Sequence, residues 1–167
     1  LALEACQERL AAFSTSKTLE YASCQKDLAI TYSMLAETEF SAEAKAQDCK
    51  KGAEASSKAL DIYNESDYPF EHAEAQLLLW AAYSALAEVE EKEKNCRRAI
   101  DACQAAVRIY EASRPAEHAD ALKSLGYSFI TLAEVADKAA NSRKAMDACS
   151  MALKHYTKEE APREHAE

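Results

Sequence analysis

Three of the four histidines recur at steps of 46 and 47 residues, and their type and spacing could support chemistry. His72, His118 and His165 each follow a Pro-x-Glu triplet, and Tyr21 takes the same place in an earlier copy. Imidazole is a common metal ligand and titrates near neutral pH, so such a ladder could bind a metal or sense pH. A residue that recurs at a recurring corner is more often structural. We therefore predict a structural role and no metal site.

Cysteine is the second residue type with chemical capacity. The six cysteines are at positions 6, 24, 49, 96, 103 and 149, with no Cys-x-x-Cys pair and no histidine at zinc-finger spacing. Cys6, Cys103 and Cys149 share one repeat position, which Ser56 fills in the remaining copy. We interpret the cysteines as small, half-buried thiols in a reducing cytosol. The alternative is a set of disulfides in an exported protein.

Motifs for catalysis are missing from the sequence. It contains no glycine-rich phosphate loop, no Gly-x-Ser-x-Gly and no His-Glu-x-x-His. Only two glycines and three prolines occur in 167 residues, which argues against barrels, sandwiches and nucleotide-binding folds. We predict a protein that is not an enzyme and that needs no cofactor.

Charge and hydropathy restrict the partners and the compartment. The net charge of −9 repels phosphate backbones, so nucleic acid is not an expected partner. No apolar run reaches the roughly 18–20 residues of a membrane span, and no signal peptide precedes the first helix. We expect no membrane association and a cytoplasmic location. The chain begins at Leu1 inside a periodic pattern, which we interpret as an excised domain or a trimmed product.

An internal repeat is the strongest signal in the sequence. Four landmarks recur at one period: Pro-x-Glu-His-Ala at 69–73, 115–119 and 162–166; Leu-Ala-Glu at 35–37, 86–88 and 132–134; Ile/His-Tyr at 62–63, 109–110 and 155–156; and a basic pair at 50–51, 97–98 and 143–144. The unit is therefore 46 or 47 residues long. The first unit carries four extra residues, close to one helical turn.

Each unit is predicted to form two helices. The first begins at the proline, whose missing N–H has no cost at the first helical position. The second begins behind Asp48, Asn95 or Asn141, which we predict as N-caps. The predicted helices are 1–13, 18–45, 48–64, 69–93, 95–112, 115–139 and 141–158. Residues 1–167 thus form one repeat domain, with a half unit at 1–13, units at 18–64, 69–112 and 115–158, and the start of a further helix at 162–167.

These residues resemble the tetratricopeptide repeat. Its pattern is Leu-Gly, then an aromatic residue, then two small residues that flank a second aromatic position, where cysteine stands here. The third unit matches it with Leu125-Gly126, Phe129, Ala145, Cys149 and Ala152, and the second with Leu79, Tyr83, Ala99, Cys103 and Ala106. Trp80 replaces the glycine in the second unit. The family's unit has 34 residues, so the chain is similar to a long-helix variant. A HEAT-like helical array is the alternative fold.

The resemblance implies a partner-binding groove lined by the first helix of each unit. Carried over by alignment, its residues here are Lys26, Ile30, Met34, Leu77, Ala81, Lys123, Tyr127 and Ile130. The mixture of apolar residues and lysines suggests docking of a peptide or helix. The alternative is that Leu77, Ile30 and Ile130 belong to the core.

The basic pair that opens each second helix is a separate candidate site. Its members are Lys50, Lys51, Arg97, Arg98, Arg143 and Lys144. Cations at a helix N-terminus oppose the helix dipole, so something should offset them. We favour ion pairing with the acidic residues that end the preceding helix or with those of the neighbouring unit. The alternative is a basic stripe that binds an acidic peptide or a phosphate.

The sequence thus predicts an all-α, right-handed solenoid of about 3.5 antiparallel helix hairpins, seven helices in all. We expect a non-catalytic scaffold that binds another protein or a peptide in the groove of the first helices. The alternative is a structural module that self-assembles into a homo-oligomer through its exposed terminal repeats.

Overall fold

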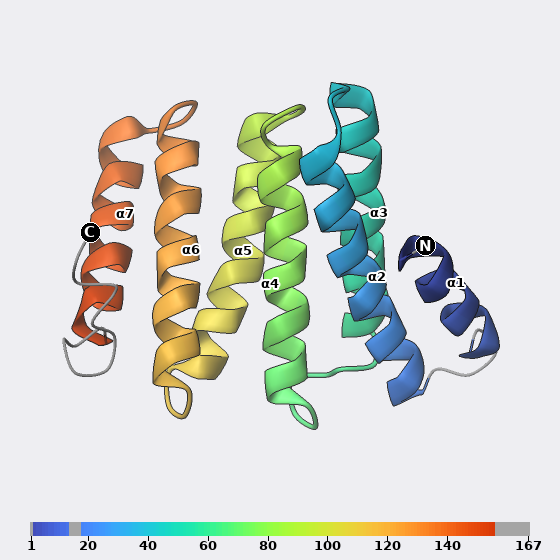
Figure 1. The fold of residues 1–167 in the computed structure, drawn as a ribbon. Helices are drawn as coiled ribbons and strands as arrows, with labels where there is room; N and C mark the ends of the chain where they lie inside the picture. Colours follow the sequence, from blue (N-terminus) through green and yellow to red (C-terminus); the bar gives the residue numbers. More distant parts are fainter. Residues whose placement is uncertain (1, 14–17, 156–167) are drawn as a thin grey trace.

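The computed structural model describes residues 2–13 and 18–155, and this part of the chain forms seven α-helices. They are α1 (Ala2–Phe13), α2 (Leu19–Thr38), α3 (Ala42–Leu60), α4 (Pro69–Leu86), α5 (Lys92–Tyr110), α6 (Pro115–Ala133) and α7 (Lys138–His155). Figure 1 shows them side by side in one row, alternating in direction. The further helix predicted at 162–167 lies outside the described residues.

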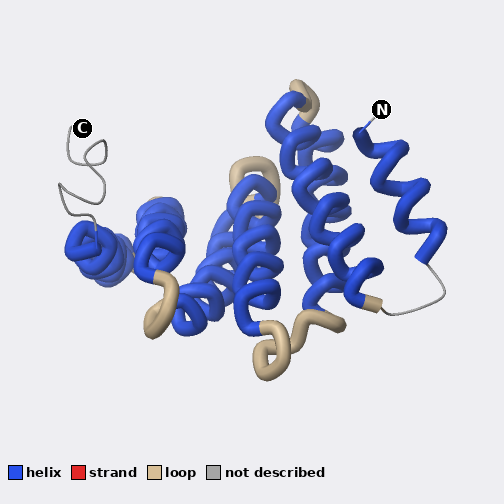
Figure 2. The backbone as a smooth tube through the Cα atoms, turned by 60° about the horizontal axis from the view of Figure 1, so that its bottom comes forward, coloured by secondary structure: helices blue, strands red, loops and turns tan. Residues whose placement is uncertain are grey.

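Each helix packs against the next one along the chain, which confirms the predicted all-α helical repeat solenoid. The described residues contain no strand, and the connections lie at the ends of the helices, along the two edges of the row (Figure 2). An amphipathic helix in such an array buries its apolar side only against its neighbours, so cohesion depends on contacts between successive units.

The predicted proline starts are confirmed. Pro69 and Pro115 are the first residues of α4 and α6. In each helix the backbone N–H three residues later bonds back to the residue before the proline, from His72 to Tyr68 and from His118 to Arg114, both at 2.8 Å. The Pro-x-Glu-His motif therefore marks one recurring helix start.

The predicted boundaries between the two helices of each unit are wrong. The first helices end at Thr38, Leu86 and Ala133 instead of 45, 93 and 139, and the second helices begin before 48, 95 and 141. The corners come earlier because the chain turns directly after the Leu-Ala-Glu landmark or within it. Two of these corners hold a left-handed residue other than glycine, Glu91 with φ 43° and Asp137 with φ 28°.

Asn95 and Asn141 were predicted as N-caps, and this prediction is wrong because both residues lie inside their helices, α5 and α7. Their amide Nδ2 atoms donate back to the carbonyl oxygens of Glu90 and Ala136, at 2.8 and 2.6 Å. Both side chains are buried, and each satisfies a backbone carbonyl group of the corner before its helix. Asp48, the third predicted cap, lies within α3 and pairs with Lys51.

Small residues let the helices approach closely. Ala73 of α4, Ala106 of α5 and Ala121 of α6 are fully buried in one cluster with Tyr110. Such positions have no room for a larger side chain, because protein interiors are packed as densely as organic crystals. The recurring small residues of the sequence are therefore the seams between helices.

Candidate binding surface

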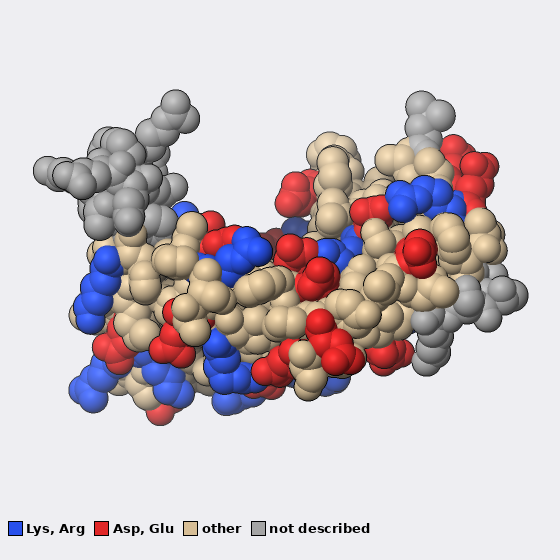
Figure 3. All heavy atoms as spheres, turned by 90° about the horizontal axis from the view of Figure 1, so that it is seen from below, with Lys and Arg blue, Asp and Glu red and all other residues tan. Residues whose placement is uncertain are grey.

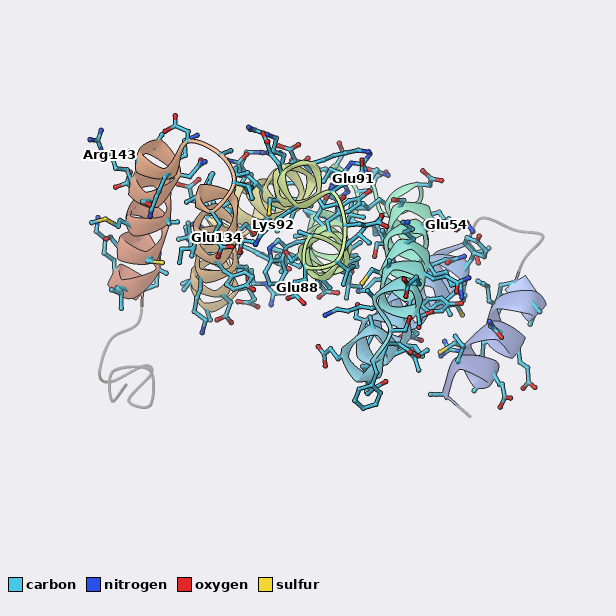
Figure 4. The ribbon with its side chains drawn as sticks, turned by 90° about the horizontal axis from the view of Figure 1, so that it is seen from above. Glu54, Glu88, Glu91, Lys92, Glu134 and Arg143 are labelled. Carbon is cyan, nitrogen blue, oxygen red and sulfur yellow. The ribbon has the colours of Figure 1, made fainter. Side chains whose placement is uncertain are left out.

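The first helices of the units, α2, α4 and α6, line one side of the row, which we call the inner face. Figure 3 shows this side along its upper edge, where the surface sinks from the N-terminal helices toward the middle of the row. Figure 4 shows the row from above, where the N-terminal helices reach further toward the inner face than the middle helices do. The predicted groove residues come from these three helices.

Large apolar side chains are exposed on the two outer helices of this face. Exposed fractions are 43% for Ile30 and 63% for Met34 on α2, and 51% for Tyr127 and 53% for Ile130 on α6. Single exposed apolar residues are ordinary, but Ile30 and Tyr127 share one repeat position, and Met34 and Ile130 lie about one turn further along at neighbouring positions. The four residues together form a candidate contact surface.

The middle helix contributes less to this surface. Leu77 is partly buried and packs against two core clusters, one of them centred on Ala73 and Tyr110. Ala81 is also only partly exposed. Leu77 therefore packs with the core, as the alternative expected. Ile30 and Ile130 do not, because both are open to solvent.

The two predicted groove lysines differ in their surroundings. Lys26 forms an ion pair with Glu74 of α4, and its Nζ lies 5.7 Å from the centre of the Tyr63 ring. Its charge therefore joins α2 to α4. Lys123 is exposed on α6.

The second residue of each basic pair lies over an aromatic ring of its own unit. The distances from the cation to the ring centre are 5.4 Å for Lys51 over Tyr32, 5.3 Å for Arg98 over Tyr83 and 5.4 Å for Lys144 over Phe129. The three rings occupy one repeat position. A cation in this place is attracted by the ring's quadrupole, so the contact holds the two helices of a unit together.

The first residues of the basic pairs have mixed partners. Lys50 pairs with Glu90 at 2.8 Å, and Arg97 pairs with Glu93 one turn earlier in α5 at 2.7 Å. Arg143 has no ion-pair partner among the described residues and points away from the row (Figure 4). None of the pairs opens a helix, because α3, α5 and α7 begin earlier. The prediction that these cations oppose the dipole at a helix N-terminus is therefore wrong. The prediction of acidic partners is correct for Lys50 and Arg97.

The histidine ladder has unlike ring partners in its two described members. His72 Nδ1 donates to the carbonyl oxygen of Tyr63 at 2.7 Å. His118 is buried, and its Nδ1 lies 3.3 Å from Nε2 of His155 at the end of α7. His155 was not predicted as a candidate, because isoleucine occupies its repeat position in other units. His165 lies outside the described residues. The shared feature is thus the helix start and not a common site for a ligand.

The pH dependence of stability should reveal His118. Burial and the neighbouring His155 lower the pKa of His118, so the unfolded chain binds a proton more readily than the folded chain. Stability should therefore fall as the pH falls from 7.5 to 5.5, through the ordinary histidine range. In urea melts, His118→Gln should show a smaller fall than the parent chain. His72→Gln is the matched control and should keep the parent's fall; equal slopes in parent and His118→Gln would contradict the assignment.

The buried thiols are placed to be unreactive. All six cysteines are free, and four of them are buried. Burial raises the pKa of Cys103 to about 12, and its Sγ lies 3.1 Å from the carbonyl oxygen of Ala121. Burial also raises the pKa of Cys49 and of Cys96. Since the thiolate is the nucleophile, these residues pack and do not react.

Neither a metal site nor a membrane helix is found in the part of the chain that the structure describes. Residues 2–13 and 18–155 contain no group of three or more histidine, cysteine or acidic side chains that could hold a metal ion. In the same residues, no helix combines the length and the apolar character needed to cross a bilayer. Comparison of the chain with protein-family models, with curated proteins and with solved structures finds no match.

Proposed function

We propose that this chain is a non-catalytic scaffold that binds a peptide or helix of another protein on its inner face. The observation that carries the proposal is the exposure of Ile30, Met34 and Tyr127 on the inner face, whose surface sinks from the N-terminal helices toward the middle of the row. Extended or helical peptides commonly dock on such surfaces through a few apolar anchors.

The polar groups of the inner face limit the orientation of the ligand. Glu74 and Asp120 are exposed at equivalent positions near the starts of α4 and α6, and Lys123 is exposed one turn after Asp120. Met34, Tyr127 and Ile130 lie further along their helices. A ligand that places apolar side chains over the latter and polar side chains near the helix starts fits this arrangement.

Selection from a random peptide library on the immobilised chain tests the proposal. Peptides that are enriched should bind the parent chain and lose about tenfold or more in affinity with Met34→Asp or Tyr127→Asp, because the charge is then buried under an apolar anchor. Leu153→Asp is the matched control, since Leu153 is equally exposed but lies on α7. Equal affinities for all four chains would place binding elsewhere and reject the inner face.

A further inference from the structure

A hollow lies at the C-terminal end of the row, apart from the middle of the inner face. It has a volume of about 500 Å³ and lies between α6 and α7, lined by Ile130, Lys138, Met146 and Cys149 among others. We call this surface the end face. Lys138 and Met146 were not predicted as candidates, although Lys138 is equivalent to Lys45 and Lys92 and Met146 is equivalent to Ile100.

The same surface one repeat earlier is filled. The residues of α5 that lie 46 positions earlier are Ile100, equivalent to Met146, and Cys103, equivalent to Cys149. Ile100 is 7% exposed, whereas Met146 is 68% exposed. Leu125, Phe129 and Leu132 of α6 lie in one cluster with Ile100 and Cys103 and cover them. Next to this cluster, Ser84 of α4 and Tyr127 of α6 line a remaining gap of only about 10 Å³.

A repeated ion pair closes each earlier seam. Lys45 of α3 pairs with Glu88 at the end of α4 at 2.6 Å, and Lys92 of α5 pairs with Glu134 at the end of α6 at 2.5 Å. Figure 4 shows Lys92 and Glu134 turned toward each other. Lys138 of α7 is the next member of this series, and it has no ion-pair partner among the described residues.

From these equivalences we infer that the end face is the docking site of one more first helix of this repeat, the helix that begins at Pro162. Residues 162–166 repeat the motif that opens α4 and α6. α7 runs toward the edge of the row on which α4 and α6 begin, the lower edge in Figure 1. Glu74 forms an ion pair with Lys26 of the preceding unit. Glu167 is equivalent to Glu74, and Lys123 is equivalent to Lys26. The occupant is therefore a helix of this pattern. An acidic residue near its end would pair with Lys138, as Glu88 pairs with Lys45 and Glu134 with Lys92.

An extended chain tests the inference. Residues 1–161 are followed by a second copy of Pro115–His155, so that the copy's proline takes the place of Pro162. Cys6→Ser is introduced in both the parent and the extended chain, and the copy carries serine at its own cysteine. Cys149 is then the one partly exposed thiol among the described residues. Its alkylation by iodoacetamide should slow about tenfold or more in the extended chain, since the equivalent Cys103 is fully buried.

Met146→Glu gives a second measurement with an internal control. In the parent chain the substitution should leave the melting temperature unchanged, because Met146 is exposed. In the extended chain the same residue takes the place of buried Ile100, so Met146→Glu should lower the melting temperature by about 5 °C.

Two results would overturn the inference. The first is an unchanged alkylation rate at Cys149 while circular dichroism shows the appended residues to be helical. The second is protection of Cys149 in the parent chain that grows with protein concentration, which would make a second copy the occupant. Peptide affinity at Met34 and Tyr127 enters neither measurement, so this test and that of the inner face fail independently.

Discussion

Phe129→Ala is expected to lower the free energy of unfolding by about 3–5 kcal/mol, as deletion of a buried ring does. Phe129 is buried in the cluster that joins α5, α6 and α7, with Ile100, Leu125 and Leu132 around it. Truncation leaves a cavity between three helices that α6 cannot fill by moving, because it is held from both sides. Chemical denaturation followed by circular dichroism measures the change.

Tyr127→Ala is the matched control for this prediction. Tyr127 lies two residues earlier on the same helix and is half exposed, so its removal should change stability by less than about 0.5 kcal/mol. A further part of the Phe129 effect comes from Lys144, whose ammonium lies 5.4 Å from the ring centre. Lys144→Ala should cost about 0.5–1 kcal/mol. Similar losses for Phe129→Ala and Tyr127→Ala would show that the two sides of α6 have been assigned wrongly.

The parts of the fold that the sequence predicts are those set by local rules. Proline fixes the starts of α4 and α6 because its ring suits the first helical turn. The small residues Ala73, Ala106 and Ala119 are fully buried because the period of the repeat places them on the facing sides of successive helices. These features need no knowledge of the neighbouring units.

The helix corners are not predictable in the same way. Asparagine near a helix start can accept a hydrogen bond as an N-cap, or donate its amide to a carbonyl group of the preceding turn. Asn95 and Asn141 do the second, and the choice depends on the left-handed residues Glu91 and Asp137 that turn the chain before them. Neither residue is a glycine, so the sequence carries no ordinary sign of such a turn.

Equivalent residues of the inner face differ in exposure for a similar reason. Lys26 and Lys123 occupy one repeat position, but Lys26 is partly buried beside Glu74 of the following unit, whereas Lys123 is exposed. Ile130 and Ser84 are also equivalent, and Ser84 lies against α6 while Ile130 remains exposed. Exposure of a repeat position therefore depends on whether a further unit follows it. This dependence is a tertiary property, and the type of one residue does not reveal it.

Trp80→Ala should be nearly as damaging as loss of Phe129, at about 3 kcal/mol, although Trp80 is only partly buried. Trp80 occupies the position that holds Gly126 in the next unit, where a Cβ atom would lie 2.7 Å from Sγ of Cys149. In its own unit the indole instead packs against the core cluster of α5 and α6. Its Nε1 donates a hydrogen bond to Ser128 Oγ at 2.8 Å, which joins α4 directly to α6.

Because this bond crosses from one unit to the next, its loss should change cooperativity as well as stability. Stability in an array is the sum of unit terms and interface terms, and a weakened interface lets units unfold separately. Trp80→Ala should therefore broaden the denaturation curve and lower its m value, whereas Phe129→Ala should shift the midpoint with less change in slope. An unchanged m value would show that Trp80 only fills space within its own unit.

A double-mutant cycle separates the hydrogen bond from the packing of the ring. Trp80→Phe keeps an aromatic ring and removes the donor, while Ser128→Ala removes the acceptor and leaves the ring in place. Each change should cost about 1 kcal/mol, and together they should cost less than their sum because they remove the same bond. Additive losses would mean that the Nε1 to Oγ contact contributes no coupling, and that apolar area alone holds α4 to α6.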